Sequence, residues 1–218
     1  CPDHGIYNEE LGRTESNSPW TWYVDPLDGT SNVAPRFRTS VVGLTVVYRD
    51  EPVIAVVANP FERTLTFAER GAGAYVSALT PEAGARRIRV APARTRRERY
   101  AEVDALFNAR STGPKVTFLQ GLAEHVQNVR MGGSHIRSWT LLAQGRIDVS
   151  LTDCIGGYWD TAPGIVIVPE AGGKVTDLDG NMPKPSQYHV ALGTSDSELH
   201  AELLALLQVC YRDYGGFR

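Results

Sequence analysis

The sequence has few cysteines, no long apolar run and no marked excess of either charge. Cys1, Cys154 and Cys210 lie far apart and form no CxxC pair, which argues against a disulfide framework and a structural zinc site. No window approaches the ~18 consecutive apolar residues of a membrane span. The first residues also lack the pattern of a secretory leader. We therefore expect a cytoplasmic protein with no membrane partner.

The charge balance and the aromatic residues exclude a further class of partner. The chain has 22 Lys and Arg against 25 Asp and Glu, a net charge of −3. Such a balance is not typical of a nucleic-acid-binding surface, and the aromatic residues show no spacing that suggests base stacking. The chain does have an ordinary globular composition, 42% apolar over 218 residues, which is enough for one large or two small domains.

Apolar runs and turn residues divide the chain into two halves. Residues 1–90 are expected to form an α+β half with strands at 20–25, 41–48, 53–58, 64–68 and 74–76, the last four as an antiparallel meander. The boundary falls in the Ala-, Arg- and Pro-rich stretch 79–97. Residues 91–218 are expected to form an α/β half, with helices at 97–110, 121–130, 134–144, 160–171 and 196–209 and strands at 115–119, 147–152, 174–178 and 190–193. This order predicts sheets covered by helices.

The most informative stretch is W-Y-V-D-P-L-D-G-T-S-N, residues 22–32, where two aspartates follow an apolar strand. The proline between them fixes the backbone, and Gly29 lets the chain bend sharply. The carboxylates of Asp25 and Asp28 and the Leu27 carbonyl can then face one point. Mg²⁺ prefers such hard oxygen ligands, with water and phosphate oxygens completing its coordination.

The same stretch has further interpretations. The N–H groups of Gly29 and Thr30 can bind an anion beside the metal. Asp, Pro and Gly are also common in surface turns, so the motif alone favours a turn about as strongly. A phosphatase that forms an aspartyl-phosphate would have D-x-D-G-T, with the aspartates two apart. Asp25 and Asp28 are three apart, which disfavours that interpretation.

Two more acidic clusters lie elsewhere in the chain. Asp160 stands in Y-W-D-T-A-P-G, residues 158–164, with E-A-G-G at 170–173. Taken alone, Asp160 is most simply the N-cap of a helix. The third cluster, Asn8-Glu9-Glu10, is most simply a solvated turn when it is taken alone.

Together and in this order, N-E-E, W-Y-V-D-P-L-D-G-T-S-N, W-D-T-A-P-G and E-A-G-G resemble the inositol monophosphatase family. Its members are magnesium-dependent, lithium-sensitive phosphomonoesterases. The resemblance covers nearly the whole chain, because the meander and the helix after Gly133-Ser134 also fall where the family has them. It implies a layered αβαβα sandwich with the active site between the two halves.

The resemblance also implies a set of metal ligands. Glu9, Asp25 and the Leu27 carbonyl would hold a first ion, and Asp25, Asp28 and Asp160 would hold a second. Glu9 would help to hold a third ion through waters. Carboxylates crowded in this way cannot all stay ionised without cations. Mg²⁺ is the expected cofactor, as two or three ions, with Mn²⁺ as a possible substitute and Li⁺ as an inhibitor.

The family mechanism assigns roles around the phosphate as well. The phosphate would lie against Asp28 and the N–H groups of Gly29 and Thr30. A metal-activated water would attack phosphorus in line, and Thr30 and Glu9 would orient that water.

Substrate contacts are implied for the loop before the 134–144 helix and for the segment before W-D. The matching positions are Gly133, Ser134 and Asp153, although the segment 152–157 is one residue longer than is usual in the family. His135 would be unusual beside a polyol, and its simpler interpretation is a polar residue on a helix face.

The expected reaction is hydrolysis of a small phosphomonoester, with inositol monophosphate as first choice. The opening P-D-H-G-I-Y-N-E-E is equally similar to members that act on histidinol phosphate, so a histidinol-phosphate phosphatase stays an alternative. A fructose-1,6-bisphosphatase or a nucleotide bisphosphate phosphatase is a further alternative, but these enzymes usually have longer insertions, for which a 218-residue chain has little room. The expected ligand is a phosphorylated polyol or amino alcohol, and a homodimer is expected by analogy.

A catalytically silent member of the family is the last alternative. Family members have helices upstream of the metal glutamate, and these carry an acidic partner for the threonine that matches Thr30. The sequence before Glu9 has no such helices. We expect residues to be missing upstream of Cys1.

Overall fold

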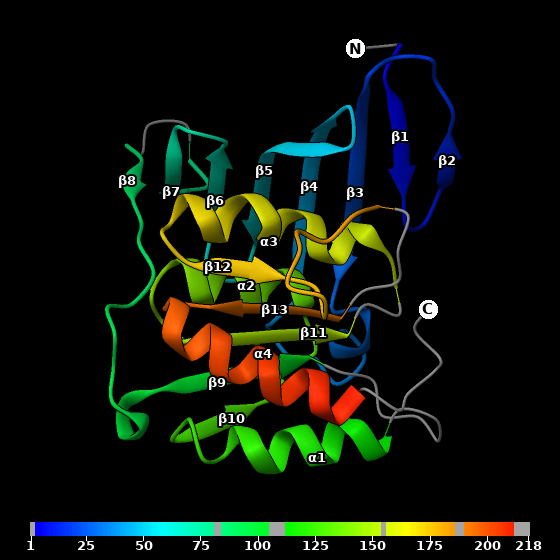
Figure 1. The fold of residues 1–218 in the computed structure, drawn as a ribbon. Coiled ribbons are helices and arrows are strands. Elements are labelled where there is room, and N and C mark those ends of the chain that lie inside the picture. The colour runs from blue at the N-terminus through cyan, green and yellow to red at the C-terminus, as the bar shows by residue number, and fades with distance from the viewer. Residues whose placement is uncertain (1–2, 81–83, 105–111, 154–155, 186–189, 212–218) are drawn as a thin grey trace.

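The structure, a computed structural model, describes residues 3–80, 84–104, 112–153, 156–185 and 190–211, with side chains except those of Thr112 and Asp153 (Figure 1). The first sheet contains β1 (Gly5–Asn8), β2 (Gly12–Thr14), β3 (Trp20–Asp28), β4 (Val41–Tyr48), β5 (Glu51–Asn59), β6 (Thr64–Glu69), β7 (Gly73–Ala78) and β8 (Arg86–Arg87). The second contains β9 (Tyr100–Asp104), β10 (Asn128–Arg130), β11 (Val149–Asp153), β12 (Lys174–Thr176) and β13 (Val190–Thr194). The helices are α1 (Thr112–Leu122), α2 (His135–Ala143), α3 (Tyr158–Glu170) and α4 (Ser197–Tyr211), with short 3₁₀ turns η1 (Thr30–Asn32) and η2 (Arg96–Glu98).

The first sheet has eight strands in the order β2-β1-β3-β4-β5-β6-β7-β8. Only the pair β1 and β3 is parallel, and β3 through β8 run antiparallel, one after the next. The predicted meander is therefore confirmed. Strands β1, β2 and β8 were not predicted, because each is short and carries little apolar alternation.

The two sheets and their helices form alternating layers. The second sheet has five strands in the order β10-β9-β11-β13-β12. Figure 1 shows α2 and α3 between the two sheets, while α1 and α4 cover the other face of the second sheet. The layered α/β sandwich is confirmed. The first sheet ends at β8 and the second begins at β9, and the division into halves at residue 90 stays a prediction.

The main core lies where α2 and α3 pack against the first sheet. Trp139 of α2 is fully buried there, with Gly164 of α3 and Gly193 of β13 against its ring. A Cβ at either glycine would lie within 2.5 Å of the indole, so the two glycines make room for it. This packing fixes α2 and α3 side by side, with the first residues of both helices at the same end.

The sequence prediction was wrong between residues 97 and 130. The stretch predicted as helix 97–110 contains β9, the strand between β10 and β11; residues 105–111 lie outside the described part. Residues 115–119, predicted as a strand, belong to α1. The helix predicted at 121–130 is also wrong, because α1 ends at Leu122 and the stretch contains strand β10. Glu102 and Asp104 hid the strand, because charged residues are seldom buried in a sheet.

Helix α1 was mistaken for a strand because Val116 and Thr117 are β-branched. Phe118 and Leu122 are four residues apart, which is the spacing of one helix face. Both are fully buried in a second core, where α1 and α4 pack against the second sheet. Packing against the sheet and α4 thus overrides the local β preference.

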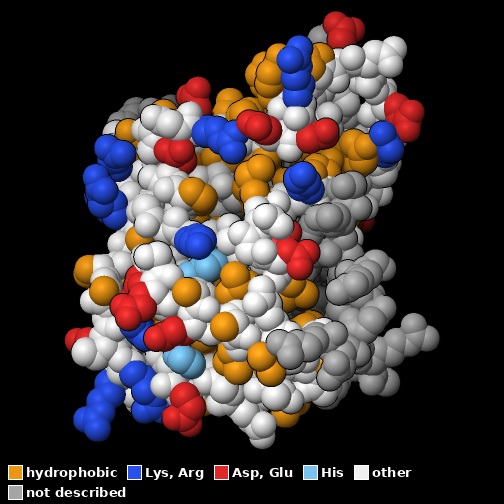
Figure 2. All heavy atoms as spheres, in the orientation of Figure 1, with side chains coloured by type: hydrophobic (Ala, Val, Ile, Leu, Met, Phe, Trp, Pro, Cys, Tyr) orange, Lys and Arg blue, Asp and Glu red, His pale blue; other side chains and the backbone are white. Residues whose placement is uncertain are grey.

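The visible face of the molecule carries charges of both signs. Figure 2 shows acidic and basic side chains interspersed over one face of the molecule, with hydrophobic side chains between them, singly and in small groups. No helix in the described ranges is both long enough and apolar enough to cross a bilayer.

Candidate metal and phosphate site

The first two carboxylates come from the end of β3, where the strand has a bulge. Asp25 pairs with Gly43 and Asp28 with Val41, so two residues of β3 stand opposite one residue of β4. Residues three apart on a regular strand point to opposite faces, but one extra residue restores the same face. The intervening proline suits this bulge, since it cannot donate to the ladder. Both carboxylates therefore face one cavity, and the strand continues beyond its predicted end at Asp25.

The Asp28 carboxylate also caps α2. Its Oδ2 accepts hydrogen bonds from the Ser134 hydroxyl and from the N–H groups of Ile136 (2.9 Å) and Arg137 (3.4 Å). Its Oδ1 accepts the His135 N–H at 3.2 Å. These N–H groups have no partner inside the helix and form its positive end. Ser134 stands at the N-cap position as predicted, but its hydroxyl donates to Asp28, and β3 supplies the capping carboxylate.

The turn after β3 needs a glycine. Gly29 has φ of 83°, and a Cβ there would lie 2.9 Å from the Gly133 carbonyl oxygen. The Asn32 side-chain amide donates to the carbonyls of Gly132 and Gly133, at 2.9 and 3.0 Å. These contacts join the end of β3 to the loop before α2, although the two segments are about a hundred residues apart.

Thr30 and Leu27 line the cavity beside this turn. The Thr30 hydroxyl donates to the Leu27 carbonyl at 3.0 Å, and the Leu27 N–H donates to Asp25 Oδ1 at 2.9 Å. A carbonyl oxygen has two lone pairs, so the Leu27 carbonyl can accept this bond and also ligate a cation. A contact of phosphate with the N–H groups of Gly29 and Thr30 stays a prediction.

Glu9 lines the same cavity from the turn between β1 and β2. Its N–H donates to the Val24 carbonyl at 3.2 Å, which fixes the turn to β3. The Asn8 side chain accepts the N–H groups of Glu10 and Leu11, at 2.9 and 3.0 Å, and so shapes the turn. Glu9 is exposed, as expected for a turn residue, yet it also reaches the cavity wall.

Asp160 lies in the first turn of α3. The helix begins at Tyr158, so Asp160 is not the N-cap residue of the simpler interpretation. Its Oδ2 accepts the Gly157 N–H at 3.3 Å, and its backbone carbonyl accepts the Trp139 indole N–H at 3.0 Å. The buried tryptophan of α2 therefore holds the start of α3 in place.

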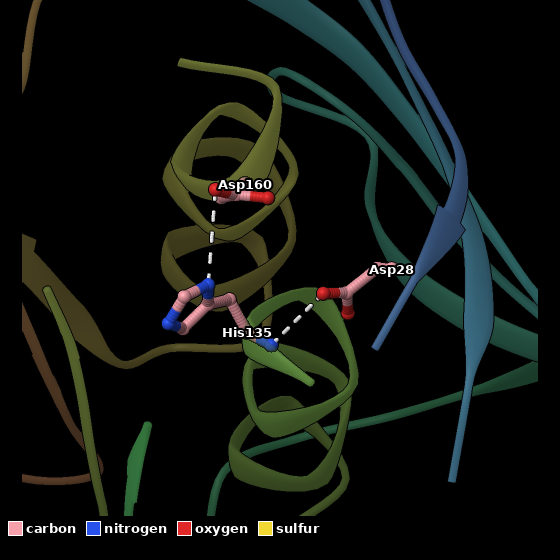
Figure 3. Close-up of side chains that lie close together, drawn as sticks. All are labelled: Asp28, His135 and Asp160. Carbon is pink, nitrogen blue, oxygen red and sulfur yellow. Dashed lines mark hydrogen bonds and ion pairs between the residues drawn. The ribbon is translucent and has the colours of Figure 1, made fainter. Parts of the chain in front are cut away.

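These residues meet around a cavity of about 560 Å³. Its wall includes the predicted residues Glu9, Asp25, Leu27, Asp28, Gly29, Thr30, Gly133 and Asp160, together with Asn32, Asp104 and His135. Among the described residues, the tightest group of possible metal ligands is Asp28, His135 and Asp160, each offering one atom within 4.8 Å of the others (Figure 3). Glu9 and Asp25 line the cavity without joining that group.

His135 is the first residue of α2, as its simpler interpretation expected, but it also lines this wall. The ring, 17% exposed, has Nε2 2.8 Å from the Asp104 backbone oxygen and Nδ1 3.7 Å from Asp160 Oδ2. Burial lowers the pKa of His135, but the carboxyls of Asp160, Asp28 and Asp104 outweigh it and raise that pKa to about 9. The ring is therefore surrounded by negative charge.

Three neighbouring carboxyls of the cavity have raised pKa values. Burial raises the pKa of Asp25 to about 8, and the neighbouring Asp28 and Glu9 carboxyls add to this. Burial likewise raises the pKa of Asp28 to about 6, against the His135 charge and the Ser134 hydrogen bond. Partial burial also raises the pKa of Glu9. Crowded hard oxygen donors with raised pKa values fit a divalent cation, whose charge offsets their repulsion.

Ser134 is 1% exposed, behind Asp28, so its contact with a substrate stays a prediction. Asp153 ends β11, and its side chain lies outside the described residues. Asp104 was missed: it ends β9, lines the cavity and accepts the Gly133 N–H at 2.6 Å. Reading Tyr100–Asp104 as a strand would have placed Asp104 at a strand end, where site residues often lie.

The chain is similar in sequence to known proteins of one family. A family model described as "Inositol monophosphatase family" matches residues 1–211. An inositol monophosphatase from Mesembryanthemum crystallinum is 32% identical over 188 residues, which cover 82% of this chain and 66% of the relative. A protein from Aquifex aeolicus named fructose-1,6-bisphosphatase/inositol-1-monophosphatase is 30% identical over 178 residues, covering 80% and 64%.

Solved structures agree with the fold. The structure of extragenic suppressor protein SuhB from Bartonella henselae matches 95% of this chain and 76% of its own, with a TM-score of 0.83 and 28% identity. The chain spans 66%, 60% and 62% of the length of the first three curated relatives, so it corresponds to about two thirds of such proteins or less. With the family model matching nearly from end to end, the chain belongs to the inositol monophosphatase family.

Proposed function

We propose that this protein hydrolyses a small phosphomonoester, with inositol monophosphate as its substrate, at the cavity between β3, α2 and α3. The observation that carries this proposal is the convergence of Glu9, Asp25, Asp28 and Asp160, from separate parts of the sequence, on one cavity. Such a concentration of hard oxygen donors has no use in a surface turn, the alternative that the first motif alone allowed.

The chain's residues would hold the cations in the arrangement that the family implies. Glu9, Asp25 and the Leu27 carbonyl would ligate one ion, and Asp25, Asp28 and Asp160 a second, with a third bound weakly near Glu9. Mg²⁺ suits these oxygen donors, Mn²⁺ can replace it, and Li⁺ is the expected inhibitor. When bound, the cations supply positive charge to the phosphate and the leaving oxygen, and lower the pKa of an attacking water.

The turn at Gly29 would position the phosphate. The αL conformation of Gly29 and the Asn32 hydrogen bonds to the loop before α2 would hold the N–H groups of Gly29 and Thr30 in one place before substrate binds. A donor that is already oriented costs no reorganisation during the reaction. The Thr30 hydroxyl donates its hydrogen bond to the Leu27 carbonyl, so the lone pairs of the hydroxyl oxygen can accept a hydrogen bond from a water. Glu9, across the cavity, would accept from the same water.

The choice of substrate rests on the relatives. The Mesembryanthemum relative is named for inositol monophosphate, and the Aquifex relative adds fructose 1,6-bisphosphate. Gly133, Ser134 and Asp153 would contact the leaving alcohol. Histidinol phosphate, bisphosphorylated nucleotides and a silent member of the family are the competing outcomes. The expected homodimer and cytoplasmic location stay predictions.

The test is phosphate release by the full-length gene product, with Mg²⁺ and with a chelator. The substrates are inositol 1-phosphate, histidinol phosphate, fructose 1,6-bisphosphate and adenosine 3′,5′-bisphosphate. Asp160→Asn keeps the bond from the Gly157 N–H but removes a charged ligand, so turnover should fall on the order of 100-fold or more. Asp179→Asn, the same change at an exposed turn, should leave turnover unchanged.

The outcomes separate the alternatives. Chelator-sensitive turnover that is fastest on inositol 1-phosphate supports the proposal, and faster turnover on another substrate names that substrate instead. An Asp160→Asn variant that keeps full metal-dependent turnover contradicts the assigned site. Absence of turnover on every substrate identifies a silent member of the family.

A further inference from the structure

The tightest group of possible ligands in the cavity contains a nitrogen. The ligands implied by the family resemblance are all oxygens, whereas here His135 stands with Asp28 and Asp160 in one compact group. Figure 3 shows the imidazole between the start of α2 and the start of α3, with its ring directed toward Asp160. The nitrogen is a feature of this chain, and its position is set by the backbone of α2.

The hydrogen bond at Nε2 fixes the tautomer of a neutral ring. A backbone carbonyl only accepts, so the 2.8 Å contact with the Asp104 carbonyl requires a proton on Nε2. The neutral ring then has its lone pair on Nδ1. Metal-bound histidines usually donate their second nitrogen in this way, to a carbonyl or a carboxylate that fixes the ring.

In the neutral ring the lone pair on Nδ1 faces the Asp160 carboxylate, and in the cation-free protein, where the neighbouring carboxyls raise the pKa of His135, a proton takes that place. Nδ1 lies 3.7 Å from Asp160 Oδ2, which is too far for a hydrogen bond. Both side chains are largely buried, at 17% and 7% exposed, so little water separates them. Two ligands that are each about 2.1 Å from one ion lie roughly 3 to 4 Å apart, depending on the angle between them. The observed separation therefore suits a shared cation.

Asp28 can complete this group while it caps α2. Its Oδ2 is occupied by the Ser134 hydroxyl and two helix N–H groups, but its Oδ1 accepts only the His135 N–H among the described residues. A carboxylate oxygen has two lone pairs, so Oδ1 keeps one for a cation.

We propose that His135 Nδ1 is a direct ligand of the divalent cation held by Asp28 and Asp160, and that it shifts the preference of this site from Mg²⁺ toward Mn²⁺, Co²⁺ and Zn²⁺. Imidazole nitrogen binds these later ions much better than it binds Mg²⁺, which keeps to oxygen. The inference rests on the proposed metal site, but it concerns one ligand only.

The test is Mn²⁺ binding to the full-length protein after removal of metals and of any histidine tag. Pulsed electron paramagnetic resonance of bound Mn²⁺ detects a directly bonded imidazole nitrogen without any need for activity. We expect that nitrogen coupling in the wild type and its loss in His135→Ala and His135→Gln, of which the second keeps the side-chain volume. His125→Ala, at a histidine outside the cavity lining, is the matched control and should keep the coupling.

Calorimetric titration gives the second readout. In His135→Ala the affinity for Zn²⁺ and Co²⁺ should fall on the order of tenfold or more, while that for Mg²⁺ changes by less than about threefold. Mn²⁺ that binds the wild type without nitrogen coupling overturns the inference and leaves the proposed function intact. A wild type that binds no divalent cation, or that binds Mn²⁺ as tightly after Asp160→Asn, overturns the metal site itself.

Discussion

Asp28 serves two parts of the protein with the same carboxylate. It caps α2 through three backbone N–H groups, and it lines the cavity in which cations are expected. The first task needs only an oxygen acceptor, whereas the second needs negative charge. Burial of the group raises its pKa, so capping alone does not require the ionised form. Asparagine caps a helix about as well as aspartate, so the proposed cation is the better explanation for a charged side chain at this position.

Substitutions at Asp28 should therefore separate the two tasks. Asp28→Asn keeps one oxygen acceptor for the Ile136 and Arg137 N–H groups and loses the bond from the His135 N–H, so the melting temperature in chelator should fall much less than in Asp28→Ala. Asp28→Ala leaves those buried N–H groups without their partner and should cost about 2 to 3 kcal/mol. Both variants should lose most of the stabilisation that Mg²⁺ gives the wild type. Thermal unfolding with Mg²⁺ and with chelator measures both effects, and equal melting temperatures of the two variants in chelator would contradict the capping role.

Among the elements, those with regular apolar patterns were predictable and those that form the site were less so. The meander β4 to β7 follows from alternating apolar residues. Strand β9 was missed because Glu102 and Asp104 replace apolar residues at buried positions beside the cavity. The bulge in β3 was also invisible, since it depends on pairing with β4. The motifs named the carboxylates that line the cavity, but their grouping with His135 required the packing of α2 against α3.

The junction between β3 and α2 gives a prediction at this scale. Gly29→Ala would place a Cβ 2.9 Å from the Gly133 carbonyl oxygen and would strain a backbone with φ of 83°. Gly71→Ala is the matched control, because Gly71 has φ of 81° and open space around it. Both should lose about 1 kcal/mol through backbone strain. Only Gly29→Ala should lose more than this, and only it should weaken Mg²⁺ binding, by about tenfold.

Chemical denaturation and calorimetric Mg²⁺ titration of the two variants check this prediction. If both lose the same stability and keep wild-type Mg²⁺ affinity, the contact between the turn and the loop before α2 has no role in shaping the site.

At the scale of the whole molecule, folding gathers ionisable side chains into one cavity, and the protein without cations does not stabilise the charged forms of all of them. The cavity's carboxyls come from β3 and the turn between β1 and β2, from the end of β9 in the second sheet, and from α3, and the histidine comes from α2. Folding brings these groups together and buries them, whereas in the unfolded chain each is hydrated and separate. The folded state without cations must therefore hold extra protons, so its stability depends on pH.

The sign of that dependence can be worked out above pH 6.5. Burial raises the pKa of Asp25 to about 8 and that of Glu102 to about 7, both far above the value of about 4 in an unfolded chain. The stability that these groups contribute is complete below pH ~4 and is lost as pH rises through 7 to 8. His135, with its pKa raised to about 9 by the surrounding carboxyls despite burial, acts in the same direction. His200, whose pKa burial lowers to about 4, acts oppositely but only below pH ~6.5.

We therefore expect the melting temperature in chelator to fall between pH 6.5 and pH 9. A bound cation replaces the protons at Asp25 and its neighbours, so the stabilisation by Mg²⁺ should grow over the same interval. Asp25→Asn removes the cavity carboxyl whose pKa burial raises to about 8, so it should weaken both trends, while His135 keeps part of the slope. Differential scanning calorimetry at pH 6.5, 7.5 and 9, with Mg²⁺ and with chelator, measures them. A Mg²⁺ increment that is the same at all three values would show that the cation does not compete with protons for these carboxyls, and would remove the electrostatic basis of the proposed site.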